Sequence, residues 1–255
     1  MARTPDLSIV IPAYNEESRI EPTVREIVAY CRQRGGAFEL ILVDDGSRDG
    51  TSAVGHSLCQ EFSELKLIRL PGNHGKGYAV RTGVVNAVGR KILFADADGA
   101  TPISELERLE AALRDGADVS VGSRALRAEG VQVQAKLYRH LIGRTFHQLV
   151  QWLANAGVQD TQCGFKGFRR AAANAIFSQQ RLDGFAFDVE VLLLARKLGL
   201  TVVDLPVEWR NSPESKVHMI RDSVRMLVDA IRIGTARDRD IATSALADRL
   251  RYAAA

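Results

Sequence analysis

Two carboxylates one residue apart close an apolar segment near the middle of the chain. Asp96 and Asp98 lie in FADADGATP, which follows RKIL. In an extended segment, side chains two residues apart point the same way, and hard divalent cations take carboxylate oxygens as ligands. The pair therefore predicts a cation site that would in turn hold phosphate groups. A plain turn rich in Asp and Gly is the alternative that these residues alone leave open.

Cationic residues near other apolar segments could meet a polyphosphate. They occur in strand-end or loop contexts, at Lys76, Arg124, Lys166 and Lys216. Lys76 lies in GNHGKG, where backbone amides at a helix start could also bind an anion. This segment is too short between its first Gly and Gly-Lys for a Walker loop, and no G-x-G-x-x-G follows the first strand. Solvated surface charges and a flexible Gly-rich turn are the alternatives.

Other chemistries find little support in the sequence. The five histidines form no H-E-x-x-H pair, and no G-x-S-x-G elbow occurs. The cysteines are odd in number and lack metal-ligand spacing, which predicts a reducing cytosol and neither a disulfide framework nor a zinc site; they are Cys31, Cys59 and Cys163. We therefore look to the carboxylates and cations for the chemistry.

Composition indicates a globular chain with an aliphatic core. The chain has 255 residues, 46% of them hydrophobic but only 6% aromatic. Its formal charge of +3 balances 34 basic against 31 acidic residues, so we expect no nucleic-acid partner. MARTPDLSIVIPAYNEE shows no signal-peptide core, and no window approaches the roughly 18 apolar residues that span a bilayer. We expect a soluble or peripheral protein.

Alternating strands and helices must position these residues. Strands are predicted over 7–11, 38–45, 65–70, 91–98 and 118–124, with helices at 20–31, 51–62, 76–88 and 102–113. Thr101 as cap, Pro102 at the first position and a capping box of Ser104 with Glu107 predict the start of the last helix. The alternation predicts an α/β fold, a doubly wound and mostly parallel sheet with helices on both faces. Such sheets bind ligands at the carboxyl ends of their strands.

The alternation ends after residue 125. Helices are predicted at 132–153, 187–199 and 217–236, with a strand at 201–209. We divide the chain into two halves of one domain, at 1–125 and 126–236, and a charged tail at 237–255. Helices 132–153 and 217–236 carry an apolar face flanked by Lys and Arg, so they could rest on a membrane surface. Packing on the sheet or on another subunit is the alternative.

A series of motifs resembles the family-2 inverting nucleotide-sugar glycosyltransferases. They are SIVIPAYNEE, LILVDDGSRDGT, GNHGKGYAVRTGV, FADADGATP, VGSRAL, DTQCGFKGFRR, FDVEVL and VEWRNSPESKV. They are most similar to the dolichyl- and polyprenyl-phosphate sugar transferases, above all the dolichyl-phosphate β-glucosyltransferases. The resemblance runs from about residue 7 to residue 233. It implies a GT-A fold, a nucleotide-diphosphate-sugar donor and a divalent cation, Mg²⁺ or Mn²⁺. It also implies that residues 1–125 form the nucleotide-sugar-binding half and residues 126–236 the acceptor-binding half of one catalytic domain. UDP-glucose is the favoured donor and GDP-mannose the alternative.

The resemblance also implies roles for individual residues. The nucleoside-binding strand ends are matched by Pro12, Tyr14, Glu16, Asp44 and Asp45, and the nucleotide sugar would also meet Lys76 and Asp96. Asp98 is the implied direct metal ligand, and Asp96 faces ribose or metal. Contacts with the diphosphate or the acceptor phosphate are implied for Arg124, Gln162, Lys166 and Lys216. Asp188 and Glu190 lie in the acceptor-side motif.

The implied mechanism follows from charge. The departing nucleotide diphosphate is an anion, so the metal and cations must stabilise its charge. An acceptor lipid phosphate is already an anion and needs no base, whereas a hydroxyl acceptor would need one, with Asp188 the candidate. Single displacement would give a β-linked product from an α-linked donor. Catalytic roles are thus implied for Asp98, Asp188, Arg124 and Lys216.

Several interpretations stay open. The favoured one is a hexosyltransferase acting on polyprenyl or dolichyl phosphate, cytoplasmic and peripheral on the inner face of a membrane. A soluble hydroxyl acceptor is the second, and a non-catalytic nucleotide-sugar-binding module the third. The oligomeric state is open.

Overall fold

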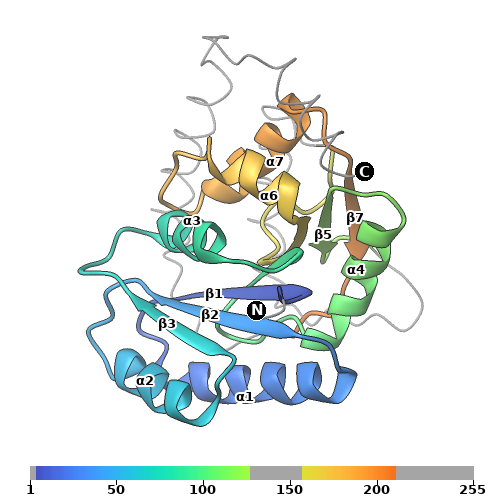
Figure 1. The fold of residues 1–255 in the computed structure, drawn as a ribbon. Helices are drawn as coiled ribbons and strands as arrows, with labels where there is room; N and C mark the ends of the chain where they lie inside the picture. Colours follow the sequence, from blue (N-terminus) through green and yellow to red (C-terminus); the bar gives the residue numbers. More distant parts are fainter. Residues whose placement is uncertain (1–3, 127–156, 211–255) are drawn as a thin grey trace.

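A seven-stranded mixed sheet organises the molecule (Figure 1). The computed structural model describes residues 4–126 and 157–210. Along the sheet the strands run in the order β3-β2-β1-β4-β6-β5-β7. They are β1 (Leu7–Ala13), β2 (Phe38–Asp44), β3 (Leu65–Arg69), β4 (Lys91–Ala95), β5 (Val119–Ser123), β6 (Phe165–Arg169) and β7 (Val202–Pro206). Only β6 among these strands runs antiparallel to its neighbours, so the prediction of a mostly parallel sheet is confirmed.

Helices cover both faces of the sheet. They are α1 (Glu17–Arg34), α2 (Thr51–Glu61), α3 (Lys76–Asn86), η1 (Ile103–Glu105), α4 (Leu106–Arg114), α6 (Arg170–Phe177) and α7 (Phe187–Lys197). In Figure 1, α1 and α2 lie on one side of β1–β3, and α3, α6 and α7 on the other. Alternate strand residues feed two cores: Val10 and Phe94 pack with α3, α6 and α7, while Ile9 and Leu93 pack with α1, α2 and α4. The period of two along each strand therefore explains the layers.

The structure corrects the predicted end of the first strand. Pro12 does not close β1, because the strand continues to Ala13 and pairs Pro12 with Val43 of β2. The described pairing of β1 with β4 already ends at Val10, so the missing proline N–H falls outside the ladder on that side.

The structure also corrects the start of the helix after β4. Pro102 precedes the 3₁₀ turn η1, and the α-helix begins only at Leu106. Neither Thr101 nor Ser104 makes a capping bond, because within this described segment no side chain caps η1 or α4. A tight 3₁₀ turn takes the place of the predicted capping box.

Beyond residue 125, two described elements are not among those predicted. β6 enters the sheet between β4 and β5, and α6 follows it directly. The helices predicted at 132–153 and 217–236, the tail at 237–255 and Lys216 lie outside the described residues. In the part that is described, no helix has the length and apolar character needed to cross a membrane.

Candidate active site

The acidic pair lies just past β4, at the carboxyl edge of the parallel strands. The amide of Ala100 donates to Asp98 Oδ1 at 3.1 Å, and Arg19 Nη1 lies 3.9 Å from Asp98 Oδ2. Burial and the nearby charge of Asp96 raise the pKa of Asp98. The two carboxylates thus share one region and repel one another, a repulsion that a divalent cation would relieve.

Lys76, the first residue of α3, reaches this acidic pair. Its Nζ lies 2.7 Å from Asp96 Oδ1 and 5.2 Å from the centroid of the Phe94 ring. Burial alone would lower the pKa of Lys76, but the charges of Asp96 and Asp188 raise it above its ordinary value. The structure therefore brings Lys76 together with Asp96 and Asp98, and phosphate binding by this group stays a prediction.

Gly164 forms the seat of the Asp96 side chain. The amide of Asp96 donates to the carbonyl of Gly164 at 3.0 Å. A Cβ atom added at Gly164 would overlap the Asp96 carboxylate, chiefly Oδ2. A residue without a side chain is therefore needed at position 164 if the carboxylate is to keep this place.

Lys166 and Asp188 form a buried ion pair behind the acidic pair. Lys166 is 1% exposed and Asp188 is 3% exposed. The ammonium of Lys166 donates to Asp188 Oδ1 and, at 2.7 Å, to the carbonyl of Cys163. It also lies 5.9 Å from the centroid of Phe94, so this ring meets both lysines. The pair joins β6 to the first turn of α7.

Arg124, directly after β5, is held by Asp160. Its Nε lies 2.6 Å from Asp160 Oδ2 and its Nη2 lies 2.9 Å from Oδ1, and its guanidinium lies 5.8 Å from the Trp209 ring centroid. Burial alone would raise the pKa of Asp160, but Arg124 lowers it to about 2. The amide of Gln162 donates to Asp160 Oδ1 at 3.2 Å. Arg124 and Gln162 therefore share one carboxylate at this strand end.

The acidic residues at the end of β2 bind the loops around them. The amide of Ser47 donates to Asp44 Oδ1 at 2.9 Å, and the amides of His74 and Gly75 donate to the two oxygens of Asp45 at 2.8 Å. Burial raises the pKa of Asp45. The expectation that amides of GNHGKG would meet an external anion is thus corrected for these two amides, because Asp45 already accepts both.

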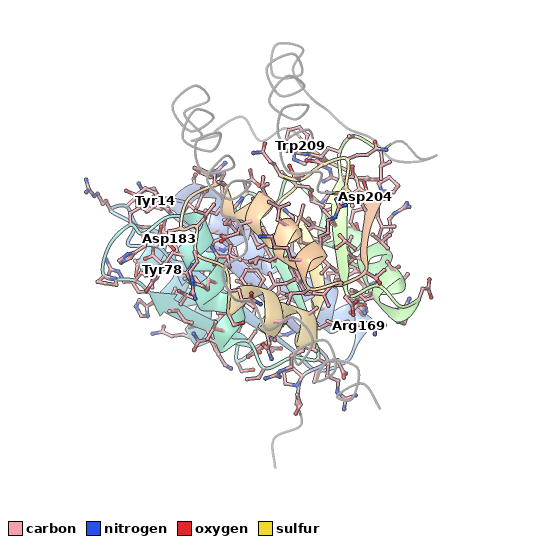
Figure 2. All side chains as sticks on the ribbon, turned by 90° about the horizontal axis from the view of Figure 1, so that it is seen from above. Tyr14, Tyr78, Arg169, Asp183, Asp204 and Trp209 are labelled. Atoms are coloured by element: carbon pink, nitrogen blue, oxygen red, sulfur yellow. The ribbon has the colours of Figure 1, made fainter. Side chains whose placement is uncertain are left out.

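The β1 end is also described. Glu16 accepts hydrogen bonds from Arg19 at 2.6 Å, and its amide donates to Thr51 Oγ1 at 2.7 Å. Tyr14 is half-buried and Pro12 is buried. In the view of Figure 2, Tyr14 lies on the same side of the molecule as Tyr78 and Asp183.

Gly75 and Gly77 of GNHGKG form a close seam with residues 180–184. The amides of Gly77 and Tyr78 donate to the carbonyl of Asp183 at 2.7 and 3.2 Å. A Cβ added at Gly77 would overlap the carbonyl of Leu182, and one at Gly75 would overlap that of Asp183. The segment is therefore a packing surface. Neither of the two interpretations of the sequence, an anion-binding loop or a flexible turn, predicted this packing.

Two further side chains hold the seam. Arg81 donates to Gln180 Oε1 at 2.9 Å and to Asp183 Oδ1 at 2.8 Å. Glu190 is buried and accepts from the amides of Arg181 and Leu182 at 2.9 and 2.7 Å. The start of α3 is thus joined to α7 through residues 180–184.

A cavity of about 530 Å³ opens between the loops that follow β2 and β3. Its lining includes Arg48, Arg69 and residues 46–47 and 70–73. The two arginines at these strand ends are not among the predicted site residues, because each stands alone in sequence among many surface cations. Gly164 and Arg19 were also missed, because no local motif reveals their contacts with distant segments.

The donor set fits a divalent cation that other oxygens help to bind. Asp96 and Asp98 offer carboxylate oxygens, the ligands of hard cations. Within the described ranges no group of three or more His, Cys, Asp or Glu side chains converges on one point. The two carboxylates would therefore hold a cation together with oxygens from a ligand.

Comparison with known proteins places these features in a family. The sequence matches the model for Glycosyl transferase family 2 over residues 8–177. Dolichyl-phosphate beta-glucosyltransferase of Homo sapiens is 39% identical over 227 residues, which cover 84% of this chain and 70% of the human protein. The Saccharomyces cerevisiae protein of that name is 35% identical over 249 residues, covering 90% and 74%.

Solved structures share the fold at lower identity. Glucosyl-3-phosphoglycerate synthase from Mycobacterium tuberculosis, solved with uridine diphosphate, has a TM-score of 0.66 at 20% identity, covering 89% of this chain and 80% of that chain. The same enzyme is known with Mn²⁺ and uridine-diphosphate-glucose. Mannosyl-3-phosphoglycerate synthase from Rubrobacter xylanophilus has a TM-score of 0.67 at 21% identity, covering 94% and 79%. The GT-A expectation is confirmed, and the chain belongs to glycosyl transferase family 2.

Proposed function

We propose that the chain transfers glucose from UDP-glucose to dolichyl or another polyprenyl phosphate, by a single displacement that inverts the sugar carbon. The observation that carries the proposal is the pair Asp96 and Asp98 beside Lys76, at the carboxyl edge of the sheet. Carboxylates and an ammonium placed together suit a cation-bound diphosphate. The names of the human and yeast relatives give the sugar and the acceptor.

The donor half of the site holds the nucleotide diphosphate. Asp98, with Asp96, would ligate Mg²⁺ or Mn²⁺, and the Mn²⁺ complex of the mycobacterial enzyme supports this choice. A bound cation supplies positive charge to the departing diphosphate. Lys76, Arg124 and Lys216 would add to that charge, the last from outside the described residues. The nucleoside would meet the ends of β1 and β2, through Pro12, Tyr14, Glu16, Asp44 and Asp45.

The acceptor half favours a phosphate over a hydroxyl. Asp188 is buried and accepts a hydrogen bond from Lys166, so an attacking hydroxyl would have to compete with this ammonium for the carboxylate. An acceptor phosphate needs no base, because it is already ionised at neutral pH. Both oxygens of Glu190 accept backbone amides, which supports a positioning role for this residue. Arg124 and Gln162 remain our proposed contacts with the acceptor phosphate. Lys166 is buried, and its positive charge would attract this phosphate without direct contact.

A donor and acceptor panel tests the proposal. Purified protein is incubated with labelled UDP-glucose or GDP-mannose, polyprenyl phosphate and either Mg²⁺ or Mn²⁺, and label is counted in the chloroform phase. We expect label from UDP-glucose, its loss with EDTA, and at least a hundredfold slower transfer by Asp98→Asn. No label in the chloroform phase with either donor would contradict the lipid acceptor, and equal label from GDP-mannose would contradict the sugar.

We also propose that the enzyme works on the cytoplasmic face of a membrane as a peripheral protein. The support is chemical, since a polyprenyl-phosphate acceptor lies in a bilayer. Sedimentation with anionic lipid vesicles tests the location. We expect the full chain to pellet with vesicles at low salt, and a chain that stays in the supernatant with acceptor-loaded vesicles would contradict the proposal.

A further inference from the structure

The ammonium of Lys76 is paired with the carboxylate of Asp96, which is one of the two carboxylates that a divalent cation would need as ligands. Its Nζ lies 2.7 Å from Asp96 Oδ1, in the region where Asp98 also lies. Lys76 is the first residue of α3, and the amide of Gly77 beside it donates to the carbonyl of Asp183. The backbone is thus held in place, while the four-carbon stem leaves the ammonium able to turn.

The carboxylate of Asp96 lies against Gly164. A Cβ atom added there would overlap Oδ2 most closely and Oδ1 as well, so the backbone covers Oδ2 more closely than Oδ1. Asp96 is 36% exposed at its side chain and Lys76 is 20% exposed, so ligands in solution can reach the pair. A cation approaching from solvent therefore meets Oδ1, where the ammonium is already bound.

The charges of the surrounding groups disfavour simultaneous binding of the Lys76 ammonium and a divalent cation to Asp96. Asp96, Asp98 and Asp188 act on Lys76, while Lys166 pairs with Asp188 and shares the Phe94 ring with Lys76. Arg19, 3.9 Å from Asp98, is itself paired with Glu16, so with both ammoniums in place these three carboxylates leave a single negative charge in excess. When Lys76 turns onto an anionic ligand, the excess doubles and equals the charge of one divalent cation.

We infer that the ammonium of Lys76 neutralises Asp96 in the free protein. When the donor binds, its diphosphate attracts this ammonium away from Asp96, so that a divalent cation can bind to Asp96 and Asp98. This inference rests on the proposed function, since it takes Asp96 and Asp98 as the cation site. The exchange is non-covalent: one ammonium leaves a carboxylate for a diphosphate oxygen, and the cation takes its place. Cation and nucleotide would thus bind together, with little cation bound to the free protein.

Substitution of Lys76 separates this exchange from a simple phosphate contact. Lys76→Met removes the charge at nearly constant length, and Lys76→Arg keeps the charge as the matched control. Mn²⁺ binding is measured on the full chain without nucleotide, by the loss of the free Mn²⁺ electron paramagnetic resonance signal. We expect Lys76→Met to bind Mn²⁺ roughly tenfold more tightly than the wild type and Lys76→Arg to bind it about as weakly. A mere phosphate contact predicts no change in either variant.

A second titration completes the test. With Mn²⁺ present, we expect Lys76→Met to bind UDP more weakly than the wild type and to show a smaller gain in Mn²⁺ affinity when UDP is added. Equal or weaker nucleotide-free Mn²⁺ binding by Lys76→Met would overturn the inference; if this variant fails to fold, Lys76→Gln replaces it. Asp98→Asn distinguishes failure of this inference from failure of the proposed cation site. If Mn²⁺ binding to Lys76→Met is unaffected by adding Asp98→Asn, the proposed cation site itself is wrong.

Discussion

Many carboxylates at the strand ends already bind groups of the protein. Asp45 accepts two amides, Glu190 accepts two amides, and Asp160 accepts Arg124. These bonds explain how charged groups tolerate burial here. Asp98 differs, since its raised pKa reflects burial beside Asp96 without a strong cationic partner of its own. At the scale of single residues, this difference distinguishes carboxylates that bind groups of the protein from Asp98, our proposed ligand of the cation.

The Arg124–Asp160 pair makes the free energy of unfolding depend on pH in the acidic range. Because Arg124 lowers the pKa of Asp160 from 3.8 to about 2, ionised Asp160 stabilises the fold by about 2 kcal/mol. The folded pKa lies below the unfolded one, so this contribution is complete at neutral pH and is lost as pH falls from about 4 to about 2. Asp160→Asn should lower the free energy of unfolding in urea by roughly that amount at pH 7. The difference from the wild type should disappear near pH 2; a difference independent of pH would contradict the ion pair.

The buried Lys166–Asp188 pair predicts non-additive substitutions. Asp188→Leu leaves the Lys166 ammonium buried without its counter-charge, so we expect it to cost roughly 3 kcal/mol of unfolding free energy. The double change Lys166→Met with Asp188→Leu removes both charges and should recover most of that loss. Urea unfolding of the single and double variants measures the coupling. Additive losses would contradict the pair as the cause.

At the scale of elements, the seam between α3 and residues 180–184 depends on Gly77. In a helix, Ala is favoured over Gly by about 1 kcal/mol, so propensity alone predicts a gain for Gly77→Ala. The added Cβ would overlap the Leu182 carbonyl, and we therefore expect a net loss of roughly 2 to 3 kcal/mol. The matched control is Gly184→Ala in the same seam, where an added Cβ meets no atom within 4 Å. A loss in both variants, measured by urea unfolding, would contradict the steric cause.

Most of the elements could be predicted from the sequence. The apolar periodicity located β1 to β5, β7, α1 to α4 and α7, because each has a buried face of regular spacing, whereas α6 was not predicted. β6 was missed because FKGFR is short and carries Lys166 and Gly167 within it. Its Lys166 is buried only because Asp188, from another segment, neutralises it. Such an element depends on tertiary contacts that no local pattern contains.

The candidate site was predicted in its parts but not in its connections. Polar strand ends and the rule for parallel sheets identified Asp96, Asp98, Lys76 and Arg124 together. The pairs that join Lys76 to Asp96 and Arg124 to Asp160 connect residues far apart in sequence, so spacing could not reveal them. The role of each residue in transfer stays a prediction until the panel of donors and acceptors is run.

At the scale of the whole molecule, ligand binding should stabilise the fold. A cation with UDP would relieve the repulsion between Asp96 and Asp98, groups that join β4 to the rest of the carboxyl edge. At about 100 times its dissociation constant, a ligand adds about 2.7 kcal/mol, which corresponds to a rise of about 5 to 10 °C in melting temperature. Differential scanning fluorimetry with Mn²⁺ and UDP measures this rise, and EDTA should remove most of it. An equal rise in Asp98→Asn would contradict the cation site.

The seat that Gly164 provides for Asp96 links two positions that lie in different strand ends. A side chain at position 164 would displace the carboxylate, and a longer acid at position 96 would meet the same backbone. Variation at these positions is therefore coupled: a selection that randomises either one alone should return only the parental residue. A library that varies both at once is the one able to move the carboxylate, and with it the metal preference of the enzyme.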